Sequence, residues 1–261
     1  MVKNRLTLGI LSIATGKYLD YWMEMVRSVD KYFPNYLDIT FHVFTEHTIS
    51  TSKLNLSNRA NLKIHKIPNY GWPEATILRY RVIGEFKTEL SEDILMHLDA
   101  DMLVRREVPF KNYLEISASK LFFVAHPGYW RPVGFERASF YLINPKTFIK
   151  DLFKRLILGG IGSWETSRKS HAFVPRSLRK EYACGAVWFG SNKQIIEFAQ
   201  SLSEQVDADY SQSVMAKWHD ESHLNSWISR NSHILLNPEL CYDPSYPNLA
   251  KIKNVIEAVQ K

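Results

Sequence analysis

Apolar and polar positions in the first hundred residues alternate between two periods. Residues 6–14 form a continuous apolar run followed by Thr15-Gly16, which predicts a buried strand that ends in a turn. From Tyr18 to Phe33 apolar residues recur at helical spacing, and Pro34 marks the end of the expected helix. Further strand-like runs occupy residues 39–44, 62–67 and 94–98, and residues 72–90 return to a helical period. This alternation predicts an open α/β sheet sandwiched by helices, in which ligands lie at the carboxyl ends of strands.

The pattern is less regular in the second half of the chain. Residues 121–125 and 140–143 are strand-like, and residues 193–207 have helical spacing. Residues 148–180 are rich in basic side chains and contain the small-residue patch Gly159-Gly160-Ile161-Gly162-Ser163. This segment is either a mobile loop over the site or an ordinary surface excursion.

Composition favours one domain over residues 1–261, because no linker, repeat or low-complexity tract interrupts a chain that is 45% hydrophobic. The formal charge of +6 suits acidic partners: nucleic acid, an anionic membrane or a nucleotide sugar. No zinc finger or basic helix favours nucleic acid. The basic residues between Lys150 and Lys180 motivate the hypothesis of peripheral membrane contact. Two cysteines without disulfide density, and no apolar stretch of about 20 residues, predict a cytoplasmic protein.

The strongest local chemistry follows the apolar run at residues 94–98. Asp99 and Asp101 flank the small Ala100, so two carboxylates would lie at the carboxyl end of a strand. Hard oxygen ligands at this spacing suit Mg²⁺ or Mn²⁺ and leave metal positions for phosphate oxygens. An Asp-x-Asp triplet also occurs in turns and helix caps, so the spacing alone leaves a structural role open.

A second cluster, Lys217-Trp218-His219-Asp220-Glu221-Ser222-His223-Leu224-Asn225, mixes aromatic, imidazole and carboxylate groups. Such groups are costly to place together unless they have partners or a function. In the structural alternative, Asp220 caps a helix that begins near Glu221. His219 and His223 have zinc-ligand spacing, but no third ligand is indicated.

These clusters, taken in order with others, resemble glycosyltransferase family 6, the family of the blood-group A and B transferases and α-1,3-galactosyltransferase. The similar pieces are Ile13-Ala14-Thr15-Gly16-Lys17-Tyr18, His42-Val43-Phe44-Thr45, Trp72 with Arg79, Asp99-Ala100-Asp101-Met102, His126-Pro127-Gly128-Tyr129, Phe135-Glu136-Arg137, and the run from Trp218 to Asn225. They cover nearly the whole chain, and the run Trp-His-Asp-Glu-Ser-His-Leu-Asn is highly specific.

The resemblance implies a GT-A fold, an open Rossmann-like mixed sheet flanked by helices, and α-retaining transfer from a UDP-sugar. It further implies that Asp99 and Asp101 hold Mn²⁺ or Mg²⁺ and that Ala100 lies by the ribose. Ile13, Ala14, Thr15 and Tyr18 match the segment that holds the uridine. Arg79 matches an arginine near the donor sugar and diphosphate. Asp220 matches a residue that binds hydroxyls of the donor sugar, and His219 lies at another donor-contacting position.

By the same resemblance, Glu221 lies beneath the anomeric carbon as a nucleophile or an ion-pair stabiliser, two roles that the sequence leaves open. His126 and Trp218 match the acceptor side, with packing in a crevice as their structural alternative. Cys184 and Ala186 match the two positions beside the donor's 2-substituent, where the methyl group of Ala186 favours UDP-galactose over UDP-N-acetylgalactosamine.

The predicted activity is therefore metal-dependent transfer of galactose in α-1,3 linkage to a galactoside-type oligosaccharide or lipid-linked glycan. The alternatives are an N-acetylgalactosaminyltransferase and a non-catalytic carbohydrate-binding protein on the same fold. The chain resembles the short soluble microbial members, since it lacks the membrane anchor of the vertebrate ones. Residues 140–181 depart from the family pattern, so the residues that would line the acceptor side of the site are not assigned from the sequence. Lys251 and Lys253 are either cations that close over the diphosphate or part of a solvated tail.

Overall fold

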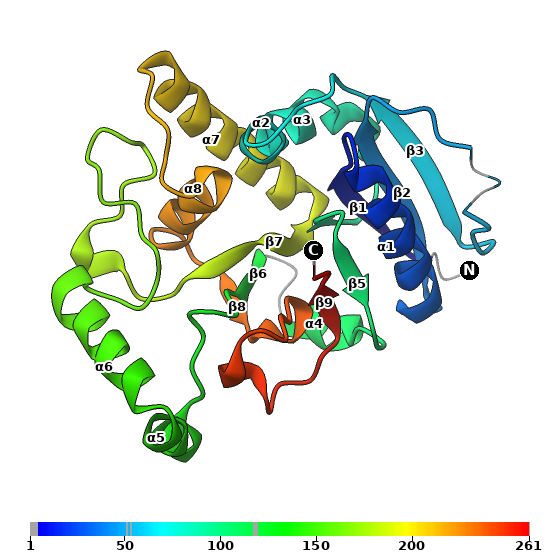
Figure 1. The fold of residues 1–261 in the computed structure, drawn as a ribbon. Helices are drawn as coiled ribbons and strands as arrows, with labels where there is room; N and C mark the ends of the chain where they lie inside the picture. The colour runs from blue at the N-terminus through cyan, green and yellow to red at the C-terminus, as the bar shows by residue number, and fades with distance from the viewer. Residues whose placement is uncertain (1–4, 51, 53, 117–119, 261) are drawn as a thin grey trace.

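The computed structural model describes residues 5–50, 52, 54–116 and 120–260. A central sheet has the strand order β3-β2-β1-β4-β7-β6-β8, and β5 pairs with β9 in a separate two-stranded sheet (Figure 1). The strands are β1 (Leu6–Ile13), β2 (Leu37–Thr45), β3 (Ala60–Lys66), β4 (Ile94–Leu98), β5 (Met102–Val104), β6 (Phe122–Ala125), β7 (Ala183–Ser191), β8 (Ile234–Leu236) and β9 (Ile256–Ala258).

The first four strands of the central sheet, β3, β2, β1 and β4, run parallel to one another. β7 is antiparallel to both β4 and β6, and β6 pairs with β8 in parallel. The sheet is therefore mixed, as the resemblance implied, and the predicted strands at residues 6–14, 39–44, 62–67, 94–98 and 121–125 are confirmed.

Helices cover both faces of the sheet. They are α1 (Tyr18–Tyr32), α2 (Glu74–Ile77), α3 (Arg79–Glu85), α4 (Phe110–Ile116), α5 (Gly134–Ile143), α6 (Pro145–Phe153), α7 (Asn192–Ser211) and α8 (His219–Ile228). Side chains of β1 alternate between the faces: Leu8 and Ile10 join the core under α1, whereas Leu11 joins the core under α3, α7 and α8. None of the described helices is long and apolar enough to cross a membrane.

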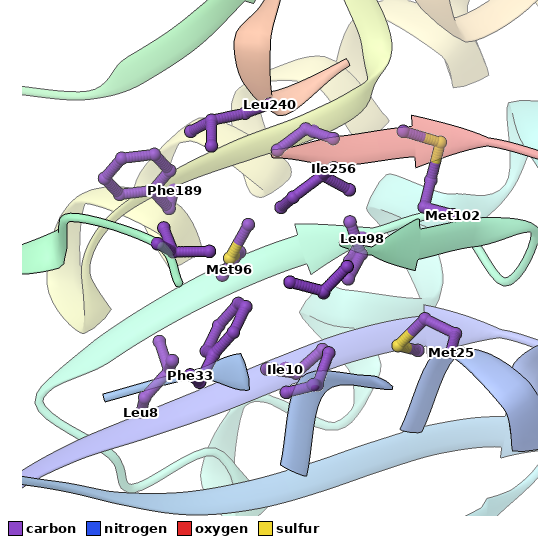
Figure 2. Close-up of a cluster of buried hydrophobic side chains, with 14 of the residues drawn as sticks. Leu8, Ile10, Met25, Phe33, Met96, Leu98, Met102, Phe189, Leu240 and Ile256 are labelled. Atoms are coloured by element: carbon purple, nitrogen blue, oxygen red, sulfur yellow. The ribbon is translucent and has the colours of Figure 1, made fainter. Parts of the chain in front are cut away.

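The core under α1 also fixes the C-terminal segment. Met25 of α1 and Ile10 of β1 lie on one side of this core, and Leu240 and Ile256 lie on the other (Figure 2). Between them are Leu98 and neighbouring residues of β4 and β7. The end of β4, which precedes Asp99, is thereby packed between the N-terminal helix and the C-terminal strand.

Three expectations need correction. Phe140 to Ile143 is not a strand but the last turn of α5, because a four-residue apolar run fits either structure and here the helical bonding continues from Gly134. The helical pattern at residues 72–90 is divided into α2, α3 and a 3₁₀ turn at Lys87–Glu89. The expected loop after residue 148 begins instead with α6 and a π-helical turn at Lys154–Leu158.

Candidate active site

Two adjoining hollows open at the carboxyl ends of β1 and β4. The first, of about 560 Å³, is lined by Ile13, Thr15, Gly16, Lys17, Tyr18, Asn69, Tyr70, Gly71, Trp72, Ala75, Thr76, Arg79, His97, Asp99, Ala100 and Asp101. The second, of about 490 Å³, shares Trp72, Thr76, Arg79, Asp99 and Asp101 with it. Its other lining residues are Met102, His126, Pro127, Tyr129, Cys184, Gly185, Ala186, Trp218, His219, Asp220, Glu221, Cys241, Asp243, Tyr246 and Ala258.

A chain of charges joins the two predicted clusters. The buried guanidinium of Arg79 lies 3.3 Å from Asp99 Oδ1 and 3.3 Å from Asp220 Oδ2. Its Nη1 also donates to Gly185 O at 2.9 Å. A buried arginine is retained at such a position because it has anionic partners and its own donors are satisfied. Arg79 thus links the Asp-x-Asp turn to the start of α8.

Burial raises the pKa of Asp220 to about 7, and the positive charge of Arg79 opposes the rise. The side chain is buried in the first turn of α8, which begins at His219 with Trp218 at the N-cap position. Asp220 therefore does not cap this helix, and the structural alternative for it is wrong. Its carboxylate instead contacts Arg79 at the junction of the two hollows.

Glu221 is held by two hydrogen bonds that reach it from the start of β7. The Tyr182 hydroxyl donates to Oε1 at 2.9 Å, and the Gly185 N–H donates to Oε2 at 3.0 Å. Burial raises the pKa of Glu221 to about 7, whereas both donors lower it by favouring the ionised form. A Cβ on residue 185 would lie 3.1 Å from Asp220 Oδ2, so glycine keeps this approach open. The carboxylate is fixed in orientation.

The Asp-Ala-Asp turn lies beside the C-terminal strand. Asp99 Oδ1 is 3.0 Å from His97 Nε2, and the backbone O of Asp101 accepts from Val259 N at 2.9 Å. Among the described residues, no group of three His, Cys, Asp or Glu side chains could hold a metal ion. A cation at this turn would therefore have at most two side-chain carboxylates as protein ligands and would need further ligands from other groups.

Aromatic side chains form the far wall of the second hollow. The His126 ring lies 4.7 Å from Tyr129 and 5.8 Å from Tyr182, centroid to centroid. Burial lowers the pKa of His126 to about 4, so its ring is neutral at neutral pH. Gly128 N donates to His126 Nδ1 at 3.0 Å, which assigns the ring proton to Nε2. Trp218 is 49% exposed and donates through Nε1 to Ser163.

His219 has a left-handed backbone, with φ of +47°, which is rare for a residue with a side chain. Its ring contacts Trp72 edge to face, with centroids 5.1 Å apart. Trp72 in turn is 77% exposed and lines both hollows. His219 lines the second hollow beside Trp72.

The predicted residues converge on this one place. The first hollow contains Ile13, Thr15, Tyr18 and Ala100; the second contains His126, Ala186, Trp218, His219, Asp220 and Glu221; Arg79, Asp99 and Asp101 border both. Ala14 is fully buried and is not among the lining residues; its backbone pairs with Phe44 and Thr45.

The sequence did not indicate several of the contacts in this region. Tyr182 directly precedes the small-residue stretch at residues 183–186, yet its bond to Glu221 spans 39 positions. Cys184 and Cys241, distant in sequence, are free buried thiols that both line the second hollow. A hydrogen bond with Cys184 raises the pKa of the Cys241 thiol. Of these three residues, only Cys184 had a predicted role, beside the donor's 2-substituent; no pattern in the sequence indicated the contacts of Tyr182 and Cys241.

The mixed sheet and the carboxylate-lined hollows at its carboxyl edge define an α/β protein with a GT-A type fold. The family model for glycosyltransferase family 6 matches residues 1–140 and 162–261. The chain belongs to glycosyltransferase family 6, and the resemblance read from its motifs is confirmed.

Relatives in the family come from animals and bacteria. The globoside alpha-1,3-N-acetylgalactosaminyltransferase 1 proteins of Gallus gallus and Homo sapiens are each 25% identical to this chain over 95% of its length. The chain spans only 65% and 64% of those two proteins. The O-antigen biosynthesis glycosyltransferase WbnI of Escherichia coli is 23% identical over 92% of this chain and 90% of its own length.

Proposed function

We propose that this protein is a retaining, metal-dependent glycosyltransferase that moves galactose from UDP-galactose in α-1,3 linkage to a galactoside-type glycan. The observation that carries the proposal is the position of Glu221. Two donors hold its carboxylate in the second hollow, and Asp220 and Arg79 connect it to the Asp-x-Asp turn. A nucleotide sugar that spans both hollows would place its reacting carbon near this carboxylate.

The first hollow would hold the nucleotide. Ile13, Thr15 and Tyr18 would contact the uridine, and Ala100 would leave room for the ribose. Its volume is in the usual range for a small-molecule site. Arg79 would donate to oxygens of the diphosphate or the sugar, since it borders both hollows.

Asp99 and Asp101 would hold Mn²⁺ or Mg²⁺ together with diphosphate oxygens. When bound, the cation would supply Lewis-acid stabilisation of the departing UDP. The contribution of the chain is orientation: Arg79 and His97 contact Asp99, and the bond from Val259 ties the backbone of Asp101 to the C-terminal segment. Pairing of the carboxylates with a cation would also offset their repulsion of an anionic donor.

Glu221 would act on the face of the sugar opposite the leaving group. Whether it forms a transient glycosyl ester or stabilises an oxocarbenium-like centre as an ion pair, it must be ionised. The hydrogen bonds from Tyr182 and Gly185 favour that state and fix the carboxylate oxygens. His219 and Asp220 would contact the donor sugar from the same helix turn.

The acceptor would lie against His126 and Trp218 in the second hollow. His126, neutral and with Nε2 carrying the proton, would donate to an acceptor hydroxyl, and the half-exposed Trp218 would offer an apolar face to a sugar ring. The O-antigen role in the name of the E. coli relative suits an oligosaccharide or a lipid-linked glycan as acceptor.

The donor sugar has a second candidate, N-acetylgalactosamine, which the names of the chicken and human relatives favour. The methyl group of Ala186 supports galactose instead. Ala186 and Cys184 are two residues apart on β7, so both side chains lie on one face of the strand, and both line the second hollow. A methyl group there reduces the space for a 2-acetamido group.

The test is UDP release from UDP-galactose and UDP-N-acetylgalactosamine, with Mn²⁺ or with EDTA, and with or without fucosylated lactose. We expect release that requires Mn²⁺ and is fastest with UDP-galactose. Asp101→Asn and Glu221→Gln should each abolish it, whereas Asp207→Asn on the exposed face of α7 should not. Failure to release UDP under every condition would favour a carbohydrate-binding role.

A further inference from the structure

The arm formed by α5, α6 and the π-helical turn, residues 133–158, carries an unusual number of exposed apolar side chains. Of the 15 large hydrophobic residues that are exposed in the described part of the chain, ten belong to this arm. They are Val133, Phe135, Leu142, Ile143, Phe148, Ile149, Leu152, Phe153, Leu156 and Ile157. Proteins that work free in water rarely gather so many on one surface, so the arm indicates a binding face.

The exposed residues follow the period of the helix. Along α6 and its extension they form adjacent pairs that recur every four residues, beginning at residues 148, 152 and 156. This spacing collects them into one stripe. Figure 1 shows α5 and α6 at the edge of the molecule, away from the central sheet. The stripe therefore faces outward over an accessible edge.

The inner side of the arm already has its partners. The Arg131 guanidinium contacts the buried Asp151 carboxylate through two hydrogen bonds of 2.5 and 3.0 Å. The Tyr141 hydroxyl donates to Asp151 at 3.0 Å, and Arg131 also donates to Gly128 O. This network fastens α5 and α6 to the turn that follows His126. The outward apolar stripe is thus a separate surface and not an incompletely packed core.

The exposed charges of the arm are almost all positive. Lys146, Lys150 and Arg155 are exposed, and Lys154 lies 4.3 Å over the Tyr129 ring. The acidic residues are neutralised: Asp151 is buried against Arg131, and Glu136 lies 3.7 Å from Lys251. Apolar side chains flanked by cations are typical of a helix that lies in the interface of an anionic membrane.

We propose that the face of residues 133–158 docks on an anionic lipid bilayer. Its apolar stripe would lie at the boundary between the headgroups and the acyl chains, and its cations would contact the headgroups. A second copy of the chain is a poorer partner, because symmetric pairing would bring Lys146, Lys150 and Arg155 against their equivalents. Residues 141–161 lie between the two segments that the family model matches.

Under the proposed function, the position of the arm would bring the acceptor side of the site to the membrane. Arg131, which holds α6, follows His126 and Tyr129 in the chain, and those two residues line the second hollow. A bilayer at the arm would therefore lie on the side of the site assigned to the acceptor. A lipid-linked glycan could then reach Glu221 without leaving the membrane.

The test is sedimentation of the full chain with vesicles of phosphatidylcholine alone or mixed with phosphatidylglycerol, at low and high salt. We expect binding to the anionic vesicles that is weakened by salt. Ile149→Ser, Leu152→Ser and Phe153→Ser combined should abolish binding, and Lys146→Ser, Lys150→Ser and Arg155→Ser combined should weaken it at least tenfold. A control with Lys31→Ser, Lys87→Ser and Lys193→Ser, all exposed lysines outside the arm, should bind like the unmodified protein.

Absence of binding at low salt, or equal binding by the apolar triple variant, would overturn the proposal. A concentration-dependent dimer in light scattering that the same variant abolishes would overturn it in favour of a second copy. Vesicle binding needs no turnover, so its failure is separate from failure of the proposed activity. UDP release with a soluble acceptor should be unchanged in all of these variants.

Discussion

The two hollows of the site are built from different parts of the chain. The first uses short stretches around the ends of β1 and β4, the turn before α2, and the start of α2 and α3, all within residues 13–101. The second draws on residues from the turn after β6, from β7 and α8, and from the C-terminal segment, between positions 72 and 258. The first is thus fixed by neighbouring parallel strands, whereas the second depends on contacts between residues far apart in sequence. Arg79 belongs to both.

The largest expected effect lies in the second hollow. Glu221→Gln keeps the size of the side chain and removes the charge that either role of Glu221 requires. We expect the rate of galactose transfer to fall by at least about a thousandfold, as for removal of a group that acts on the transition state. Initial rates of UDP release at saturating donor measure the loss. Donor binding, measured by calorimetry, should change little.

Tyr182→Phe is the matched positioning variant. It removes the hydroxyl that orients Glu221 but leaves the carboxylate in place, so we expect a loss of about ten- to a hundredfold, confined to kcat. An equal loss in both variants would mean that the hydrogen bond, rather than the carboxylate, carries the chemistry. An undiminished rate in Glu221→Gln would remove Glu221 from the mechanism.

Arg79→Met tests the connection between the two hollows. The substitution leaves the buried Asp220 and the partly exposed Asp99 without their shared cation. Removal of one partner from a buried ion pair costs about 3–5 kcal/mol, so the urea midpoint should fall sharply. Arg79→Lys keeps the charge and should lose less stability. If Arg79→Met unfolds at the same urea concentration as the unmodified protein, the two regions are not coupled through this residue.

The parallel-strand region should also respond to acid. His65 and Glu92 lie on either side of His42, with contacts of 2.9 and 3.0 Å. Burial lowers the pKa of His65 from 6.5 to about 4. Bonding to His42 lowers the pKa of Glu92 from 4.5 to about 2 against the opposing effect of burial.

In both cases the unfolded chain binds the proton at the higher pH. Stability should therefore fall as pH drops from 6.5 towards 4 because of His65, and from 4.5 towards 2 because of Glu92. Urea midpoints measured between pH 7.5 and 4 should decline, and His65→Gln should flatten that decline by an amount on the order of 1–3 kcal/mol. His47→Gln, at a half-exposed position, should leave the decline intact. A decline that persists in His65→Gln would assign it to other groups.

The contrast between the hollows also explains what could be read from the sequence. The strand before Asp99 was evident because four of the five residues of β4 are apolar, and a parallel arrangement brings its end beside the end of β1. No local pattern indicates that Arg79 meets Asp220, or that Tyr182 donates to Glu221. Those contacts are set by how β7 and α8 pack, which depends on the whole sheet.

The arm shows a different reason why a prediction from the sequence fails. Residues 140–143 looked like a strand because an apolar run usually marks a buried element, and the pattern at residues 148–157 lay in a segment expected to be a loop. In the structure these apolar side chains point outward, so burial did not determine their position. A rule that reads apolar periodicity as core fails where the apolar face is itself a binding surface.

The smallest expected effect concerns donor choice in the second hollow. Ala186→Gly removes one methyl group from the wall formed with Cys184, which should shift preference towards UDP-N-acetylgalactosamine by about tenfold, the usual scale for one methyl group in a pocket. The ratio of kcat/KM for the two donors measures it. Ala183→Gly makes the same change at a fully buried position of β7 that lines neither hollow, so it should lower stability and leave the ratio unchanged. If both variants shift the ratio equally, the effect comes from backbone flexibility in β7. If Ala186→Gly leaves the ratio as it was, another side chain of the second hollow selects the donor, and Cys184 becomes the next position to change.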